Sequence, residues 1–346
     1  LIGTVSTSTK VRMWIVGPVS KVTRDLSGII NDFGVGRLPG NRLPEEPAWR
    51  ERAVQLRDHL FQNSDVVFTE YEEVVFVPDG PLWYLPFEIL PFPEHATDLF
   101  VDRLKIRYAP TPGFAIKLDQ KPTNREPKVA ISADLFFAPR DLEKNEATID
   151  ELLGLLPETI RLPDPVGSPS CFLGSTISDL IVARPQFVNP KNPLAFHPAG
   201  YDQGLAMGTV KAWLRFPTAA PSRLVMKGFR TPVDGGQMAV GDELFRTLCA
   251  IHSSGVQEVL VSRWAVGGQS SAILARELIK ALPDSSLSDA WRAAREVLQG
   301  SDLEPEDEPL LTKAEHGLKG LTGTEPLFWS GYLLSAPAFE KEKPNP

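Results

Sequence analysis

This 346-residue chain has few side chains that could act as nucleophiles or metal ligands, because it contains only two cysteines and five histidines. Cys249 and His252 form a C-x-x-H pair on a predicted helix, and two ligands without further partners are weak evidence for a metal. Cys249 lies beside apolar residues, where a thiol is inert. Cys171 lies in the loop GSPSCFLGS and its role is open. We therefore expect no metal site.

Two serines open a predicted helix after a predicted strand, as the nucleophile of a serine hydrolase does. Ser270 and Ser271 lie in GGQSSA, which does not match G-x-S-x-G, so helix capping explains them better. The chain also lacks the glycine-rich motifs G-x-G-x-x-G and G-x-x-x-x-G-K-[ST]. We expect no nucleotide and no other cofactor.

The elements that must position any site alternate between strands and helices, which favours a mostly parallel sheet covered on both sides. The turn Pro78-Asp79-Gly80 predicts a strand–turn–strand unit, with its second strand over residues 82–90. The acidic run 302–308 is expected to be a solvated loop. The other predicted strands cover residues 11–16, 74–77, 104–108, 129–133, 193–196, 222–226, 258–264 and 326–334. The predicted helices cover residues 22–33, 49–63, 147–156, 175–183, 241–254, 267–282 and 289–298.

Composition excludes several classes of partner. The net charge of −8 and the pI near 5.3 argue against nucleic acid, which needs a basic surface. No apolar run reaches the roughly 18–20 residues of a membrane span, so no membrane partner is expected. Two cysteines give no disulfide framework, which favours a reducing, cytoplasmic location. Because the first residue is Leu1, we expect a fragment or a processed chain.

Four motifs occur in an order that resembles the CHAT family of caspase- and separase-like cysteine peptidases. The string VVFVPDGPLWYLPFEIL, residues 74–90, is similar to the family's PDG-L-x-x-LPF signature, and IRYAPTP, residues 106–112, to the segment after it. EVLVSRWAVGGQSSAILARELIKAL, residues 258–282, resembles the family's Trp-containing loop and following helix. PLFWSGYLL, residues 326–334, resembles its closing strand. The resemblance runs from about Leu56 to Ala336.

The resemblance implies a caspase/haemoglobinase-like three-layer α/β/α sandwich with a mostly parallel sheet. It also implies a degenerate N-terminal caspase-like half, residues 1–120, before a caspase-like half, residues 129–338. The polar segment 119–128 is the expected linker, and residues 339–346 are an expected disordered tail. The family further implies a protein or peptide partner, an upstream helical-repeat region or larger assembly, and a bacterial signalling or defence setting.

The resemblance also implies a His–Cys dyad, in which the His follows a strand in a THG pattern and the Cys lies in a SACET pattern. His197 takes the first position, although Pro198 replaces the Gly and removes its N–H. Arg230 takes the Cys position and cannot act as a nucleophile, because it stays protonated. Arg263 and Trp264 are candidates for lining the cleft, and for Trp264 core packing is an equal alternative.

These residues lead to a hypothesis of a catalytically inactive CHAT-like pseudoprotease that acts as a scaffold, regulator or peptide-binding module. The alternative is a divergent active peptidase that uses His197 and an unrecognised nucleophile. A third reading treats the chain as one structural part of a larger assembly.

Overall fold

The fold is described by a computed structural model of the chain. Its description covers residues 2–5, 11–14, 19–35, 48–61, 68–93, 97–115, 128–133, 136–137, 141–162, 177–184, 186–187, 191–195, 197, 209–215, 220–235, 238, 240–308, 311 and 320–337.

A ten-stranded sheet in the order β2-β1-β3-β4-β12-β11-β9-β7-β5-β6 forms the centre of the molecule. Pairing is antiparallel between β1 and β2, β1 and β3, and β11 and β12, and parallel at the other six junctions. The strands are β1 Ile2–Val5, β2 Val11–Trp14, β3 Glu73–Val77, β4 Lys105–Tyr108, β5 Val129–Ala133, β6 Ile160–Arg161, β7 Asp179–Ala183, β9 Arg223–Met226, β11 Glu258–Ser262 and β12 Tyr332–Ser335. The predicted mostly parallel sheet is confirmed.

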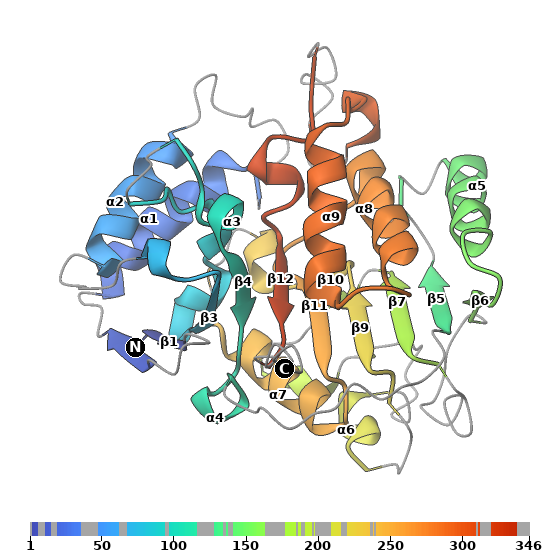
Figure 1. Cartoon of the computed structure of the whole chain (residues 1–346), viewed down its shortest axis with the longest axis horizontal. Coiled ribbons are helices and arrows are strands. Elements are labelled where there is room, and N and C mark those ends of the chain that lie inside the picture. The colour runs from blue at the N-terminus through green and yellow to red at the C-terminus, as the bar shows by residue number, and fades with distance from the viewer. Residues whose placement is uncertain are drawn as a thin grey trace, which may run out of the picture.

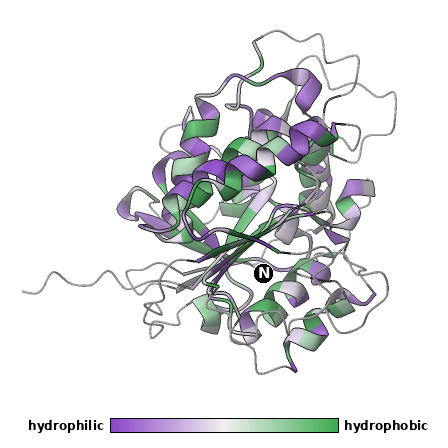
Figure 2. Cartoon of the chain, turned by 90° about the vertical axis from the view of Figure 1, so that its right-hand side faces the viewer, coloured by the Kyte–Doolittle hydropathy of each residue, from purple (hydrophilic) through white to green (hydrophobic). Residues whose placement is uncertain are grey.

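Helices cover both faces of this sheet (Figures 1 and 2). The longer ones, α1, α2, α5, α8 and α9, lie on one side, and the shorter α4 and α6 lie with α7 on the other. The helices are α1 Val19–Asp32, α2 Trp49–Phe61, α3 Phe100–Arg103, α4 Pro112–Ala115, α5 Leu142–Leu153, α6 Val210–Trp213, α7 Asp242–Ser253, α8 Gly268–Ala281 and α9 Leu287–Gln299. Because β5, β7 and β11 are covered on both faces, all their residues are buried. The predicted three-layer α/β/α architecture is confirmed.

The sheet is continuous from the N-terminal to the C-terminal elements. The last strand, β12, lies between β4 and β11, and Ser335 pairs with Tyr108 across the first of these junctions. Residues 119–127 of the expected linker and the expected tail 339–346 lie outside the described residues. The division into two caspase-like halves stays a prediction.

One predicted helix is wrong, and the error matters for the site. Residues 175–183 were expected to form a helix, but Asp179–Ala183 is strand β7, which lies between β9 and β5. A short, wholly buried parallel strand shows no alternation of polar and apolar residues, so its pattern resembles that of a buried helix.

Two predicted strands are also wrong. The apolar run 82–90 forms two 3-10 turns, η2 Gly80–Tyr84 and η3 Phe87–Ile89, because its prolines cannot donate ladder hydrogen bonds. Residues 193–196 were expected to be a strand, and Pro193–Ala195 is instead the 3-10 turn η5.

Helix α2 buries Ala53, Leu56, Leu60 and Phe61, as its periodicity predicts.

Candidate functional site

The carboxyl ends of β7 and β9 are adjacent, because these strands pair in parallel. A short two-stranded sheet, β8 Gln186–Phe187 and β10 Phe229–Arg230, continues beyond them. In its parallel register Phe229 lies opposite Gln186 and Arg230 opposite Phe187. The Gln186 N–H donates to the Gly228 carbonyl at 2.7 Å. Ligands bind most often at the carboxyl edge of a parallel sheet, so we treat this edge as the candidate site.

His197 does not stand at the end of a sheet strand, as the sequence predicted. It follows the 3-10 turn η5, and the strand beside β9 is β7, which ends at Ala183. Because β7 was not recognised in the sequence, the segment before His197 was taken for the strand beside β9. His197 is still near the edge, since its carbonyl accepts a hydrogen bond from Gln186 Nε2 at 2.9 Å. Gln186 therefore connects His197 to the β8–β10 pair.

Arg230 is partly exposed and lies at this edge, next to the 3-10 turn η7, Pro232–Gly235. Within that turn, Asp234 Oδ1 accepts a hydrogen bond from the Ala265 N–H at 2.6 Å. Burial raises the pKa of Asp234 to about 6, while the Ala265 N–H and the positive charge of Arg230 oppose the rise. The edge thus carries a guanidinium and a carboxyl group whose pKa is raised by burial.

Arg263 does not line an open cleft, because its side chain is fully buried. Its Nη1 donates to the carbonyls of Ser330, at 2.9 Å, and Tyr332, at 2.5 Å, and its Nε donates to the Trp83 carbonyl at 3.3 Å. Its Nη2 lies 3.5 Å from Glu88 Oε2. Arg263 therefore holds the end of β11 against the closing segment and against η2.

Trp264 is also fully buried, which fits the core-packing alternative rather than the cleft. Gly331 lies directly against its ring, since a Cβ added to Gly331 would be 2.7 Å from Trp264 Nε1. The close approach of these two residues requires a glycine at position 331.

A buried polar cluster surrounds Glu88 and was not predicted from the sequence. The Tyr108 hydroxyl donates to Glu88 Oε2 at 2.7 Å, and the Arg263 guanidinium lies 4.8 Å from the centre of the Tyr108 ring. Burial raises the pKa of Glu88, and the charge of Arg263 opposes the rise. A single acidic residue inside the apolar run PLWYLPFEIL was the available signal, because a buried carboxylate needs a partner.

Both residues of the C-x-x-H pair, Cys249 and His252, lie on α7. Both ring nitrogens of His252 are engaged, Nδ1 with the Val256 carbonyl at 2.9 Å and Nε2 with Ser335 Oγ at 2.8 Å. Burial raises the pKa of the Cys249 thiol, which opposes formation of a thiolate. Among the described residues there is no group of three or more His, Cys, Asp or Glu side chains that could hold a metal ion. Cys171 lies outside the described residues.

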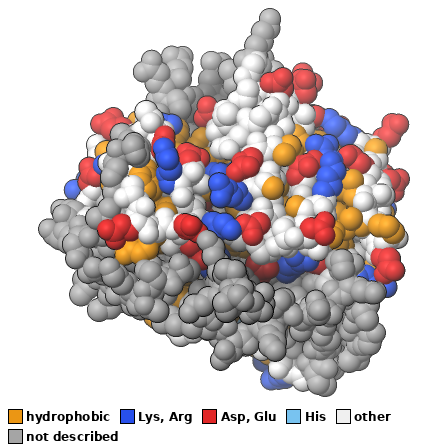
Figure 3. All heavy atoms as spheres, viewed as in Figure 1, with side chains coloured by type: hydrophobic (Ala, Val, Ile, Leu, Met, Phe, Trp, Pro, Cys, Tyr) orange, Lys and Arg blue, Asp and Glu red, His pale blue; other side chains and the backbone are white. Residues whose placement is uncertain are grey.

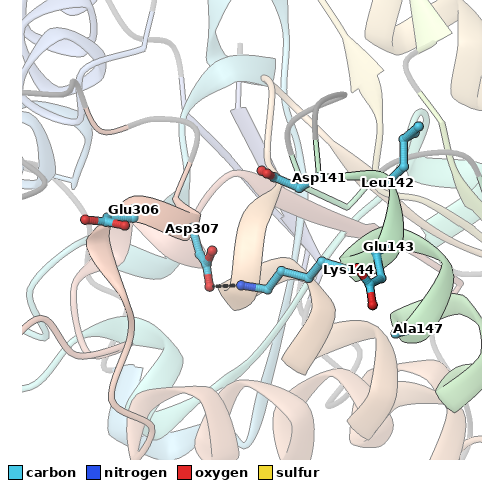
Figure 4. A pocket seen from close by; sticks show the side chains of 7 residues that line it. All are labelled: Asp141, Leu142, Glu143, Lys144, Ala147, Glu306 and Asp307. Atoms are coloured by element: carbon cyan, nitrogen blue, oxygen red, sulfur yellow. Dashed lines mark hydrogen bonds and ion pairs between the residues drawn. The ribbon is translucent and has the colours of Figure 1, made fainter.

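The face of the molecule in Figure 3 carries mixed charge, with acidic and basic side chains interspersed. A hollow of about 580 Å³ opens between the start of α5 and the acidic run. Figure 4 shows Lys144 reaching across it to form an ion pair with Asp307. No helix in the described part of the chain is long and apolar enough to cross a membrane.

Comparisons with known proteins place part of the chain in a family. No curated protein matches the chain. It is similar to Saccharomyces cerevisiae separase, solved in complex with securin, at 15% identity and a TM-score of 0.41 over 74% of this chain. The chain spans only 15% of that separase chain. It is similar to Porphyromonas gingivalis RgpB, solved as a complex of pro- and mature domains, at 11% identity and a TM-score of 0.44, over 94% of this chain and 78% of that one.

Similarities at such low TM-scores carry no conclusion about activity, substrate or partner. The sequence match is more specific, since residues 233–337 match the family model of the CHAT domain. This range includes α7, β11, α8, α9 and β12, and hence two of the four motifs noted in the sequence. Over residues 233–337 the chain thus matches the CHAT domain family.

Proposed function

We propose that this chain is a catalytically inactive CHAT-domain protein, a pseudoprotease that acts as a scaffold, regulatory or peptide-binding module. The observation that carries the proposal is the β8–β10 pair beyond β7 and β9. The segments that follow these two strands read RPQFV, residues 184–188, and KGFRT, residues 227–231, and contain neither histidine nor cysteine. A thiolate–imidazole pair cannot be built from them.

The proposal is tested by mass-spectrometric cleavage profiling of the purified chain against a diverse peptide library, with His197→Ala as the control. The expected result is no specific cleavage by either protein. Cleavage by the unmodified chain that His197→Ala abolishes would instead establish the divergent active peptidase with an unrecognised nucleophile. Cleavage that survives His197→Ala would also refute the inactive reading, and it would show that His197 is not the base.

The binding role is proposed for the edge that carries Arg230 and Asp234. A guanidinium offers a planar fork of donors that suits a carboxylate of a peptide. The test compares how tightly the Arg230→Ala and Arg246→Ala variants bind a protein or peptide partner. Arg246 is the control, because it is an exposed arginine on α7 that pairs with Asp242. The expected result is a loss of affinity in the first variant only. Equal affinity of both variants would remove Arg230 from the binding surface.

A further inference from the structure

The first turn of α8 is capped by a carboxylate from a distant segment. Helix α8 follows Gly267, which has no side chain that could cap the helix. The Ser270 N–H donates to Glu308 Oε1 at 2.7 Å, and Ser270 Oγ donates to Glu308 Oε2 at 2.8 Å. Both oxygens of one carboxylate are therefore bound at a helix N-terminus, where the helix dipole favours negative charge.

A buried lysine completes this cluster. Lys227 follows β9, and only 4% of its side chain is exposed. Its Nζ lies 3.6 Å from the centre of the Phe136 ring and has no hydrogen-bond partner among the described residues. The carbonyl of Phe136 accepts the Gly268 N–H at 2.7 Å, so the lysine lies next to the start of α8. A buried ammonium without hydrogen bonds is costly unless an anion compensates it.

Glu308 belongs to a segment, residues 301–308, that we call the strap. The sequence predicted this acidic run to be solvated, but Glu308 is only 2% exposed. The strap is fixed to α8 through Gln269, whose Oε1 accepts the Glu304 N–H at 2.7 Å. Its Asp307 pairs with Lys144 on α5. The expectation holds for Asp302, Glu304 and Glu306, which are exposed. It is wrong for Glu308, because the sequence does not show that this residue packs against the start of α8.

The charges of the cluster support a site built to receive an anion. Burial lowers the pKa of Lys227 to about 7, and the negative charge of Glu308 opposes this change. Burial also raises the pKa of Glu308 to about 7, and the hydrogen bonds from Ser270 oppose that rise. Each group is thus desolvated, and each stabilises the charge of the other.

We propose that the first turn of α8, Ser270 and Lys227 form a carboxylate-binding site, which Glu308 occupies as an internal ligand. Its external ligand is a carboxylate that takes the place of Glu308. Two sources share this chemistry, a free small carboxylate and an acidic side chain presented by a protein. The inference is independent of the proposed function, since it concerns neither His197 nor Arg230.

The test uses the full chain with Glu308→Ala, which vacates the site, and acetate as the first probe. Acetate is expected to raise the melting temperature of this variant in a saturable manner. The matched control Lys227→Met/Glu308→Ala is expected to bind acetate at least about tenfold more weakly, because it lacks the ammonium. The wild-type chain is expected to need a much higher acetate concentration for the same shift, because Glu308 competes for the site. Equal shifts in both variants, or none in either, would overturn the proposal.

The second probe distinguishes the two sources of the carboxylate. It is the peptide SDLEPEDE, the sequence of residues 301–308, compared with the same peptide ending in Gln. Binding of the Glu peptide but not the Gln peptide to Glu308→Ala supports an acidic side chain as ligand. Binding of acetate without binding of the peptide supports a free small carboxylate. Equal binding of both peptides, with no response to acetate, would contradict a carboxylate site.

A second set of variants decides the question if Glu308→Ala does not fold. Glu308→Gln keeps the volume of the side chain, and its unfolding is compared with those of Lys227→Met and the double variant. Because the two charges compensate each other, the effect of Lys227→Met is expected to depend on Glu308. The substitution should lower the melting temperature more when it is made in the wild-type chain than when it is made in the Glu308→Gln variant. Equal losses would show that Lys227 does not interact with the carboxylate, which would overturn the proposal.

Discussion

Arg263 and Glu88 meet in the interior of the protein, with Arg263 Nη2 3.5 Å from Glu88 Oε2. They are 175 positions apart in the sequence. Glu88 lies in η3, within the PDG-LPF signature, and Arg263 follows β11 at the start of the Trp-containing loop. The pair therefore joins the first motif of the chain to the third, and both motifs serve the packing of the sheet.

Removing one partner of this pair is expected to destabilise the protein strongly. Arg263→Met leaves the Glu88 carboxylate buried without its countercharge, at a cost of about 3–5 kcal/mol in the free energy of unfolding. Arg292→Met, which breaks an exposed pair with Glu296, is the control and should cost less than about 1 kcal/mol. Urea unfolding measures both, and similar losses would contradict a structural role for Arg263.

Glycine is required at position 241 for steric reasons. Gly241 and Gly320 both have positive φ, 81° and 71°, but only at Gly241 would a Cβ collide, 2.2 Å from the Gly80 carbonyl oxygen. Gly320→Ala should cost about 1–2 kcal/mol from backbone strain alone. Gly241→Ala should cost clearly more, because the start of α7 must separate from the PDG turn. Equal losses in thermal melts would contradict this contact.

The pH dependence of stability should contain a contribution from His252. Burial lowers the pKa of His252 from 6.5 to about 4, so the folded chain holds the ring neutral. The resulting stability is fully present above pH 6.5 and is lost progressively between pH 6.5 and about pH 4, a loss of about 3 kcal/mol. Unfolding free energies of the wild type and His252→Gln, measured from pH 7 to pH 4, should converge. A constant difference across this range would contradict a neutral, buried imidazole.

The layers of the fold could be predicted from the sequence, but strand β7, which lies between β9 and β5, could not. Alternating apolar segments and turn residues located β5, β9, β11, α2 and α8, because these elements carry clear periodicity or clear ends. Strand β7 was mistaken for a helix, since a run buried on both faces has no polar side to reveal its period.

This error affected the predicted position of the site more than it affected the predicted fold. With β7 unrecognised, His197 appeared to end the strand beside β9, and the structure shows that it follows a 3-10 turn. The buried partners of Arg263 and Lys227 depend on contacts between segments far apart in the chain. No local pattern predicts such contacts, although isolated charges in apolar surroundings indicate that some partner exists.

The central claim, that the chain has no working thiol nucleophile, is tested most directly by intact-mass spectrometry after incubation with peptide-based electrophiles that label cysteine peptidases. Cys171→Ala and Cys249→Ala identify any residue that is labelled, and His197→Ala shows whether labelling depends on the histidine. The account predicts that Cys249 is labelled slowly, because burial raises the pKa of that thiol. It also predicts that labelling of neither cysteine depends on His197. Rapid labelling at one cysteine that His197→Ala abolishes would contradict it and establish an active peptidase.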